Sequence, residues 1–241
     1  MKKLLLTALF ATTALSVAAK DTITFAMEPT YAPFESTTEK GEIVGFDVDL
    51  AKALCTELEM TCQFKNTPFD SLIPSLKFKK FDAIISAMDV TEKRQKQVSF
   101  TEPYLENSAS FLALKEKKTP ETAKIVGVQN GTTYQEYLVK KAPQYQTKAY
   151  ASLQSAILDL KNGRIDMIFG DTPVLAEWLE TEKSVTFVGD KIKDKAFFGI
   201  GYGIAVNKSN QELLEKLNTA LKTVKENGTL DKIYQTWMTK K

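Results

Sequence analysis

Residues 81–94 read FDAIISAMDVTEKR and contain the change from strand to helix on which the fold prediction rests. The apolar residues between Phe81 and Ile85 are typical of a short buried strand. The polar residues that follow predict a helix with Thr91 as its N-cap. In open α/β sheets, ligands bind beyond the carboxyl ends of the strands. We therefore expect a binding site at this junction.

Two charged side chains at the junction indicate the chemistry of the ligand. Arg94 is one of only two arginines in a chain that is rich in lysine. A guanidinium holds a carboxylate through a planar, two-pronged contact that lysine cannot reproduce. Asp89, five residues earlier, is suited to an ammonium group. Together the two residues indicate an α-amino acid.

The first nineteen residues predict a secretory signal peptide. Lys2 and Lys3 precede an uncharged segment at 4–17, and the small residues at 17–19 fit cleavage after about Ala19. The uncharged segment is too short for a comfortable membrane span. We therefore expect the mature chain to be exported, and the family resemblance described below implies that it resides in the periplasm.

Charge and composition narrow the classes of function. Without Lys2 and Lys3, basic and acidic residues are equal in number, which argues against nucleic acid or an anionic membrane as the main partner. Histidine is absent, which removes Ser–His and Cys–His activation and the commonest transition-metal ligand. Chemistry based on carboxylates or lysine stays open. We expect a monomer with no cofactor, no metal and no catalytic residue.

Cys55 and Cys62 are the only cysteines, and in an exported protein they should form a disulfide. Residues seven apart in one helix lie about 10 Å apart along its axis, too far for this bond. The helix that contains Cys55 should therefore end near Met60, and Cys62 should begin a returning strand. Redox catalysis is the less favoured alternative, because the spacing is not that of a C-x-x-C motif.

Strand and helix patterns alternate along the chain, which predicts parallel sheets covered by helices on both faces. Strands are expected at 22–27, 62–65, 81–86, 124–129 and 164–169, and helices at 47–60, 69–78, 153–162 and 171–182. The segment 76–84 is similar to 160–168, which indicates two similar lobes. Asp82 and Asp166 occupy matching positions in this repeat, and we expect them to be turn or helix-stop residues.

Two apolar segments, 110–115 and 199–206, are predicted to be strands that join the lobes. The second has glycines at alternate positions, which permit bending or close approach of the backbone. Helices at 211–226 and 229–238 should return to the first lobe. The expected domains are a signal peptide at 1–19, a first lobe formed by 20–109 and 201–241, and a second lobe formed by 110–200.

Five motifs, in order, resemble those of the periplasmic polar amino-acid binding proteins of ABC importers, solute-binding protein family 3. They are TYAPF at 30–34, GFDVDLAKAL at 45–54, FDSLIPSLK at 69–77, DAIIS followed by T-x-x-R at 82–94, and GVQNGTTYQEY at 127–137. SAMD at 86–89 and the glutamine after GV are most like the arginine-binding branch. The resemblance implies an α/β, type II periplasmic-binding-protein fold. Its two lobes, each a mixed, mostly parallel sheet flanked by helices, would be joined by a two-strand hinge.

The resemblance also implies that the lobes close over L-arginine and deliver it to the membrane permease of an ABC importer. Its ligand-binding residues would be Glu28, Tyr31, Phe69, Ser86, Ala87, Met88, Asp89, Arg94, Gln129, Thr132, Thr133 and Asp171. Arg94 would hold the α-carboxylate, helped by Ser86 and by backbone N–H groups around Thr132 and Thr133. Asp171 would hold the α-ammonium.

The remaining contacts would surround the ligand side chain. Tyr31 and Phe69 would enclose it, and Glu28 and Gln129 would meet its far end. Ala87 and Asp89 differ from the hydroxyl residues of the lysine/histidine branch. Aromatic faces suit a guanidinium, at about 0.5–2 kcal/mol per contact.

The charge of the predicted site points to the same ligand. Glu28, Asp89 and Asp171 outnumber Arg94, so the site is net negative and suits a cationic amino acid. Glutamine would leave Glu28 as an uncompensated buried charge.

Two alternatives stay open. The ligand could be lysine, ornithine, histidine or glutamine. The same scaffold could instead be a cyclohexadienyl-dehydratase-like enzyme whose carboxylates act as general acid and base. The absence of histidine and the presence of an ammonium-binding Asp171 favour binding without catalysis.

Overall fold

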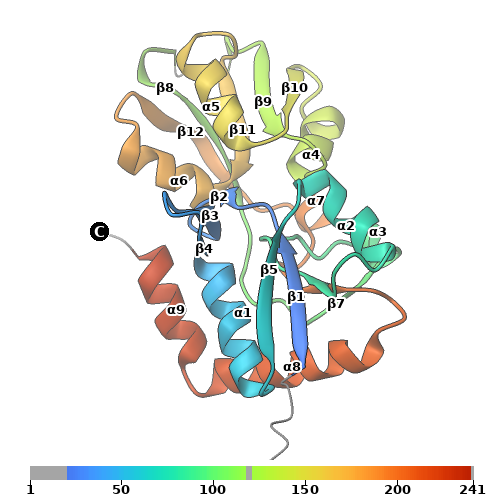
Figure 1. Ribbon diagram of the computed structural model, residues 1–241. Coiled ribbons are helices and arrows are strands. Elements are labelled where there is room, and N and C mark those ends of the chain that lie inside the picture. The colour runs from blue at the N-terminus through green and yellow to red at the C-terminus, as the bar shows by residue number, and fades with distance from the viewer. Residues whose placement is uncertain (1–20, 118–120, 240–241) are drawn as a thin grey trace, which may run out of the picture.

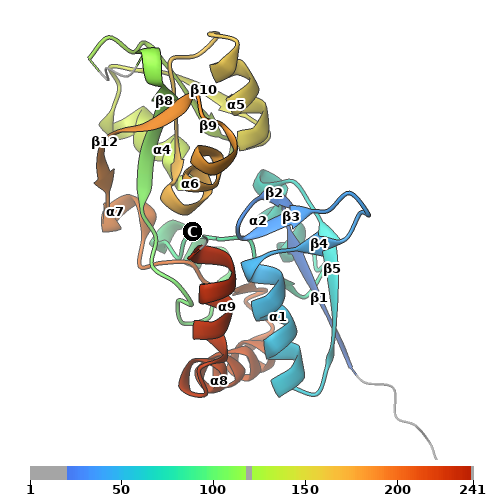
Figure 2. The same ribbon diagram turned by 90° about the vertical axis from the view of Figure 1, so that its left-hand side faces the viewer.

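The computed structural model describes residues 21–117 and 121–239, so the predicted signal peptide at 1–19 lies outside the described residues. The chain forms two α/β lobes, each with a five-stranded sheet, and Figures 1 and 2 show one lobe above the other. This arrangement confirms the predicted fold class.

The first lobe contains a mixed sheet with the strand order β5-β1-β6-β13-β7. Its strands are Thr61–Asn66, Thr22–Met27, Ala83–Ile84, Ala205–Val206 and Ser99–Phe100. β1 pairs in parallel with β5 and β6, and β13 pairs antiparallel with β6 and β7. Four of the six residues of β1 and both residues of β6 are buried, as expected of central strands covered on both faces.

Helices enclose the first sheet. α2 (Phe69–Lys77) contacts β1 and β6, while α8 (Gln211–Glu226) and α9 (Thr229–Met238) pack on α1 (Phe46–Glu57). Both C-terminal helices have the predicted bounds, and both return to the first lobe (Figure 1). A small antiparallel sheet of β2 (Thr30–Tyr31), β3 (Glu35–Thr37) and β4 (Ile43–Val44) precedes α1 and had no counterpart among the predicted elements.

The second lobe contains a sheet with the order β10-β9-β11-β8-β12. Its strands are Gln146–Tyr150, Ile125–Gln129, Met167–Asp171, Ala109–Leu114 and Val185–Ile192. Its helices are α4 (Thr133–Lys141), α5 (Leu153–Lys161), α6 (Thr172–Thr181) and the short α7 (Lys195–Phe198). The two edge strands β10 and β12 were not predicted, because polar and charged residues interrupt their apolar pattern.

The prediction that 110–115 forms a strand connecting the two lobes is wrong. Residues 110–114 belong to β8, which pairs antiparallel with β11 on one side and β12 on the other. The chain instead crosses between the lobes at 101–108 and 199–204, which we call the hinge segments. They run side by side: the Tyr104 N–H donates to the Tyr202 carbonyl at 2.8 Å, and the Tyr202 N–H donates to the Leu105 carbonyl at 2.9 Å.

Glycine permits the close approach of the second hinge segment to its neighbours, as the alternating glycines predicted. Gly201 has a φ of +126°, and a Cβ there would lie 2.5 Å from the Leu105 carbonyl oxygen. Gly199 has a φ of +69°, and a Cβ there would lie 1.9 Å from the Val90 carbonyl oxygen. A side chain at either position would therefore force the segments apart.

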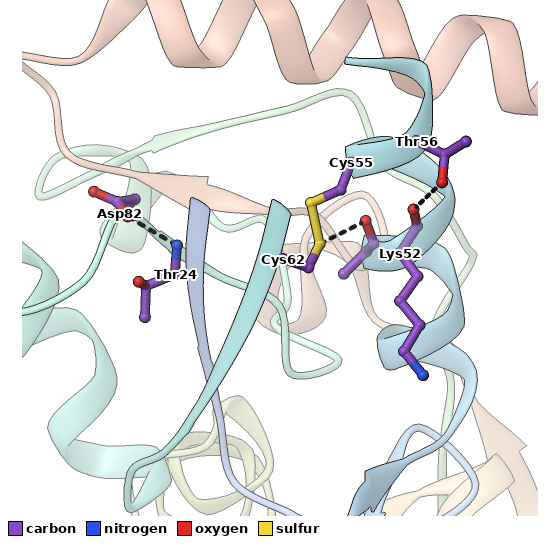
Figure 3. The surroundings of a disulfide bond; sticks show 7 residues. Thr24, Lys52, Cys55, Thr56, Cys62 and Asp82 are labelled. Atoms are coloured by element: carbon purple, nitrogen blue, oxygen red, sulfur yellow. Dashed lines mark hydrogen bonds between the residues drawn. A yellow bond between two sulfur atoms is a disulfide. The ribbon is translucent and has the colours of Figure 1, made fainter. Parts of the chain in front are cut away.

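The predicted disulfide is present between Cys55 and Cys62 (Figure 3). Their Cα atoms are 5.9 Å apart. Helix α1 ends at Glu57 and β5 begins at Thr61, so the chain reverses between the two cysteines. The bond joins the end of a helix to the start of the edge strand beside it.

The repeated aspartates, predicted as turn or helix-stop residues, hold neighbouring strands through their side chains. Asp82 Oδ2 accepts the backbone N–H of Thr24 at 2.8 Å (Figure 3), and Asp166 Oδ2 accepts those of Lys124 and Ile125 at 2.8 Å. Each carboxylate thus binds the beginning of a neighbouring strand, at equivalent positions of the two lobes. None of the helices within the described ranges is both long enough and apolar enough to cross a membrane.

Candidate functional site

Arg94 lies between the lobes, where the strand-to-helix junction places it. α3 (Glu92–Gln95) begins after Thr91, whose hydroxyl accepts the Arg94 N–H at 3.3 Å and thereby confirms the predicted N-cap. The Arg94 side chain is 7% exposed. Its Nη1 donates to the Asp89 carbonyl at 3.1 Å, and its Nη2 donates across the lobes to the Gly131 carbonyl at 3.3 Å.

An aromatic ring accompanies the guanidinium. The Arg94 Cζ lies 5.5 Å from the ring centroid of Phe69, at the first turn of α2, which is a cation–π distance. Burial lowers the Arg94 pKa, and the charge of Asp89 opposes this shift. The group therefore stays cationic, because an arginine pKa begins far above neutral pH.

The amino-terminal end of α4 faces Arg94. Thr132 is the N-cap: its hydroxyl accepts the Gln135 N–H at 3.2 Å and donates to the Gln129 carbonyl at 2.7 Å. The Thr133 hydroxyl donates across the lobes to the Asp89 carboxylate. A helix amino terminus next to a guanidinium is suited to a carboxylate group.

Asp89 is buried and belongs to the first lobe. Its carboxylate accepts hydrogen bonds from the Thr133 hydroxyl and from the side-chain amide of Asn107. Asn107 was not among the site residues predicted from the sequence. Burial raises the Asp89 pKa to about 6, and Arg94 acts in the opposite direction. Asn107 also donates to the Phe198 carbonyl, so this amide links the site to the end of α7.

Asp171 is the last residue of β11 and is 1% exposed. Three tyrosine hydroxyls donate to its carboxylate: Tyr31 to Oδ2, and Tyr134 and Tyr202 to Oδ1. Burial and the charge of Asp89 raise the Asp171 pKa to about 7, against the effect of the three hydroxyls. The Asp171 side chain does not cap α6, so its hydrogen bonds go to these tyrosines.

Tyr134 and Tyr202 are site residues that the sequence analysis missed. Tyr134 lies in the GTTYQEY stretch, and Tyr202 lies in the glycine-rich hinge segment at 199–204. A buried tyrosine beside apolar residues has the pattern of a core aromatic, so no local signal distinguishes it from one whose hydroxyl reaches a carboxylate.

Glu28 and Gln129 contact each other from opposite lobes, and their predicted contact with the far end of the ligand stays a prediction. Gln129 Nε2 donates to Glu28 Oε2 at 2.8 Å, and the Thr30 hydroxyl donates to Glu28 Oε1. Burial raises the Glu28 pKa, which both hydrogen bonds oppose. Gln129 Oε1 is buried and has no hydrogen-bond partner among the described residues. The pair therefore offers acceptor atoms to a donor-rich group.

The predicted residues Ser86, Ala87 and Met88 contact the first lobe. The Ser86 hydroxyl accepts the Glu28 N–H at 3.2 Å and donates to Glu35 Oε1 at 2.6 Å. Ala87 has a φ of +42°, and its N–H donates to Asp47 Oδ2 at 2.7 Å. Met88 is buried in a core cluster of the same lobe. Their contact with a ligand stays a prediction.

Glu35 and Asp47 form a buried carboxyl pair beneath this loop. Burial and the nearby charge of Asp47 raise the Glu35 pKa well above its usual range. Burial also raises the Asp47 pKa, to about 7, and the Ala87 N–H and the Tyr104 hydroxyl oppose that shift. Asp47 Oδ2 is the hydrogen-bond acceptor for this loop.

A groove of about 1050 Å³ runs along the outside of the site, between α2 and α3 of the first lobe and α4 and α7 of the second. Arg94, Thr132 and Thr133 line it, whereas Glu28, Tyr31 and Asp171 do not. Lys93 spans it with an ion pair to Glu136, at 2.9 Å. The lobes are therefore closed over the more deeply buried part of the site.

The site is suited to binding a ligand that carries both positive and negative groups. It combines one guanidinium and a helix amino terminus with the carboxylates of Glu28, Asp89 and Asp171. Within residues 21–117 and 121–239, no cluster of three or more histidine, cysteine, aspartate or glutamate side chains is arranged to hold a metal ion.

Comparisons with known proteins agree with this geometry. The chain is 55% identical to the arginine-binding periplasmic protein of Mannheimia haemolytica, over 99% of each chain. It is 38% identical to the histidine-binding periplasmic protein of Escherichia coli, over 97% of this chain and 95% of that protein. A solved structure of a Salmonella typhimurium periplasmic binding protein, described as having high arginine specificity, matches with a TM-score of 0.88. That match has 42% identity and covers 91% of this chain and all of that one.

The family model for bacterial extracellular solute-binding proteins, family 3, matches residues 23–240. This range includes all but the first residue of the two sheets, both hinge segments and all the candidate site residues. The chain therefore belongs to the family 3 bacterial extracellular solute-binding proteins.

Proposed function

We propose that this protein is a periplasmic receptor that captures L-arginine by hinge closure and delivers it to the membrane permease of an ABC amino-acid importer. The excess of buried carboxylates over guanidinium groups between the lobes is the observation that carries the proposal. Glu28, Asp89 and Asp171 oppose the single Arg94. A ligand with two cationic groups and one carboxylate is net positive and therefore suits such a net negative site, and arginine is an amino acid of this kind.

One end of the site receives the backbone of the amino acid. Arg94 and the N–H groups at the start of α4, around Thr132 and Thr133, bind the α-carboxylate. Asp171 binds the α-ammonium, and Asp89 adds a second negative charge beside it. This assignment is supported by the burial of all these groups, because a buried charge needs a partner of opposite sign.

The other end receives the guanidinium. Tyr31 and Phe69 enclose the side chain, and Glu28 and Gln129 accept hydrogen bonds from its far end. The unpaired Oε1 of Gln129 supports this role. Ser86, Ala87 and Met88 complete the predicted ligand set, as the loop that connects the two ends.

The ligand should favour closure of the two lobes, because the groups that bind it lie on both of them. Glu28 and Arg94 belong to the first lobe, and Gln129 and Asp171 to the second. A ligand that contacts both therefore binds the closed form more tightly than the open form. The names of the arginine-binding relatives support the choice of ligand.

The organisation that we propose has a signal peptide cleaved after about Ala19 and a mature, monomeric receptor in the periplasm. Its first lobe comprises 20–109 and 201–241, and its second comprises 110–200. The chain crosses between the lobes at the two hinge segments, 101–108 and 199–204, which supports boundaries close to residues 109 and 201.

Calorimetric titration tests the proposal. The mature protein is unfolded and refolded to remove any bound ligand, and then titrated with arginine, lysine, ornithine, histidine and glutamine. We expect tight one-to-one binding of arginine and much weaker binding of glutamine, which cannot neutralise Glu28. Absence of arginine binding, or equal affinity for glutamine, contradicts the proposal.

A further inference from the structure

The three hydroxyls that donate to Asp171 come from three different parts of the molecule. Tyr31 lies on β2 of the first lobe, Tyr134 lies in α4 of the second lobe, and Tyr202 lies on a hinge segment. When the lobes separate, the Tyr31 contact must break and the Tyr134 contact can persist. The behaviour of Tyr202 depends on how it is held.

The backbone of Tyr202 is held on both sides. Its N–H donates to the Leu105 carbonyl at 2.9 Å, and its carbonyl accepts the Tyr104 N–H at 2.8 Å. On its other side it forms an antiparallel bridge with Asp89. Tyr202 therefore lies where the two hinge segments meet the loop that contains the second carboxylate of the site.

The ring of Tyr202 is also fixed. It is fully buried, and it packs edge-on against Phe34, with ring centroids 5.2 Å apart, and beside Tyr104 at 6.3 Å. A ring packed on two sides has little rotational freedom, so its hydroxyl points in one direction.

Asp171 is held close to the same hinge. It pairs with Ala109, the first residue of β8, directly after the other hinge segment. The next residue, Thr172, donates its N–H to the Ser108 carbonyl at 2.8 Å. Both ends of the Tyr202–Asp171 contact thus lie near the rotation axis, where displacements during closure are smallest.

We propose that Tyr202 is a positioning residue whose hydroxyl, held on the hinge, orients the Asp171 carboxylate for the ligand ammonium in both the open and the closed form. The proposal rests on the proposed function, since it assigns the ammonium to Asp171. It assigns to Tyr202 a role in ligand binding without direct contact with the ligand.

The charges around Asp171 give this role a measurable signature. Burial and the charge of Asp89 raise the Asp171 pKa, whereas the three hydroxyls lower it; Arg94 is the nearby cation. A protonated Asp171 cannot pair with an ammonium group, so affinity should fall as the pH decreases through this pKa. Loss of the Tyr202 hydroxyl raises the Asp171 pKa and moves that fall to higher pH.

The test compares Tyr202→Phe with Tyr104→Phe. Tyr104 is a buried tyrosine of the other hinge segment, but its hydroxyl donates to Asp47, at 3.0 Å. Arginine affinity is measured by calorimetry from pH 5.5 to 8.5. In the ligand-free proteins, the Asp171 side-chain carboxyl is titrated by carbon-13 NMR and assigned with Asp171→Asn.

For Tyr202→Phe, we expect the Asp171 titration to move up by about one pH unit. Arginine binding should then be weaker by about tenfold at pH 5.5, about fivefold at pH 7 and less than about twofold at pH 8.5. Tyr104→Phe should leave the Asp171 titration unchanged.

Three results overturn the inference: an unchanged Asp171 titration in Tyr202→Phe, an equal loss of affinity at every pH, or the same shift in Tyr104→Phe. A constant loss is what a purely structural role of Tyr202 predicts. If the unaltered protein fails to bind arginine at any pH, the proposed function fails instead. The NMR titration still decides whether Tyr202 controls Asp171.

Discussion

Replacement of Asp171 by asparagine should weaken arginine binding without lowering the stability of the folded protein. Asparagine has nearly the same shape, and its Oδ1 can still accept the Tyr134 and Tyr202 hydroxyls. Its Nδ2 can donate to the Tyr31 oxygen. The substitution therefore preserves packing and removes only the charge that we assign to the ligand ammonium.

The magnitude follows from the burial of Asp171. Removal of one partner from a buried, hydrogen-bonded charge pair costs about 2–5 kcal/mol of binding free energy. At about 1.4 kcal/mol per factor of ten, arginine affinity should fall by roughly 30-fold to several thousand-fold.

Stability of the ligand-free protein should change in the opposite direction or not at all. The folded-state pKa of Asp171, about 7, lies above its ordinary value of 3.8. The folded state therefore disfavours the charge, and the penalty grows as the pH rises from about 4 to 7. At pH 8, Asp171→Asn should unfold at the same temperature as the unaltered protein, or at a higher one.

Asp166→Asn is the matched control, because this carboxylate binds two backbone N–H groups rather than the site. It should lower the free energy of unfolding by about 1–2 kcal/mol and leave arginine affinity unchanged. Affinity is measured by calorimetry and stability by thermal unfolding. Arginine binding by Asp171→Asn within threefold of the unaltered protein refutes the assignment, and so does a large loss of its stability.

Three further predictions concern other buried groups. Glu28→Gln should weaken arginine binding by about 2–5 kcal/mol in calorimetry, with little effect on glutamine; an equal loss for both ligands contradicts its pairing with the guanidinium. Cys55→Ser with Cys62→Ser should lower the free energy of unfolding by about 2–3 kcal/mol in urea denaturation and leave affinity unchanged; reduced affinity would link the disulfide to the site. Because the folded-state pKa values of Glu35 and Asp47 are raised, stability should fall as the pH rises from about 4 to 7. Urea titrations should show a smaller fall in Glu35→Gln, and an unchanged fall excludes the pair as its cause.

Local sequence patterns predicted the elements whose boundaries depend on neighbouring residues. Helices α8 and α9 have the predicted bounds because Asn210 caps the first and the Asn227-Gly228 break separates them. Thr91 caps α3 as predicted and thereby positions Arg94. The cysteine spacing required a chain reversal between Cys55 and Cys62, and the chain reverses there.

Local patterns of this kind could not predict where each element lies in the folded protein. The apolar run at 110–115 fits both a hinge strand and a central strand, and only its pairing with β11 and β12 identifies β8 as central. Likewise, Asp166 immediately precedes β11 and Asp171 is its last residue, five positions later. One binds backbone N–H groups and the other collects three tyrosine hydroxyls.

The sequence by itself determined the alternation of strands and helices, the disulfide, the two-lobed family and most of the charged residues between the lobes. The tertiary structure decided which strands cross the hinge and that Tyr134 and Tyr202 reach Asp171. The physical reason is the separation along the chain of the residues that determine each property. Backbone conformation and capping depend on residues a few positions apart, whereas the burial and charge of a side chain depend on distant segments. Tyr31 and Asp171 are separated by 140 residues, and only the folded chain brings them into contact.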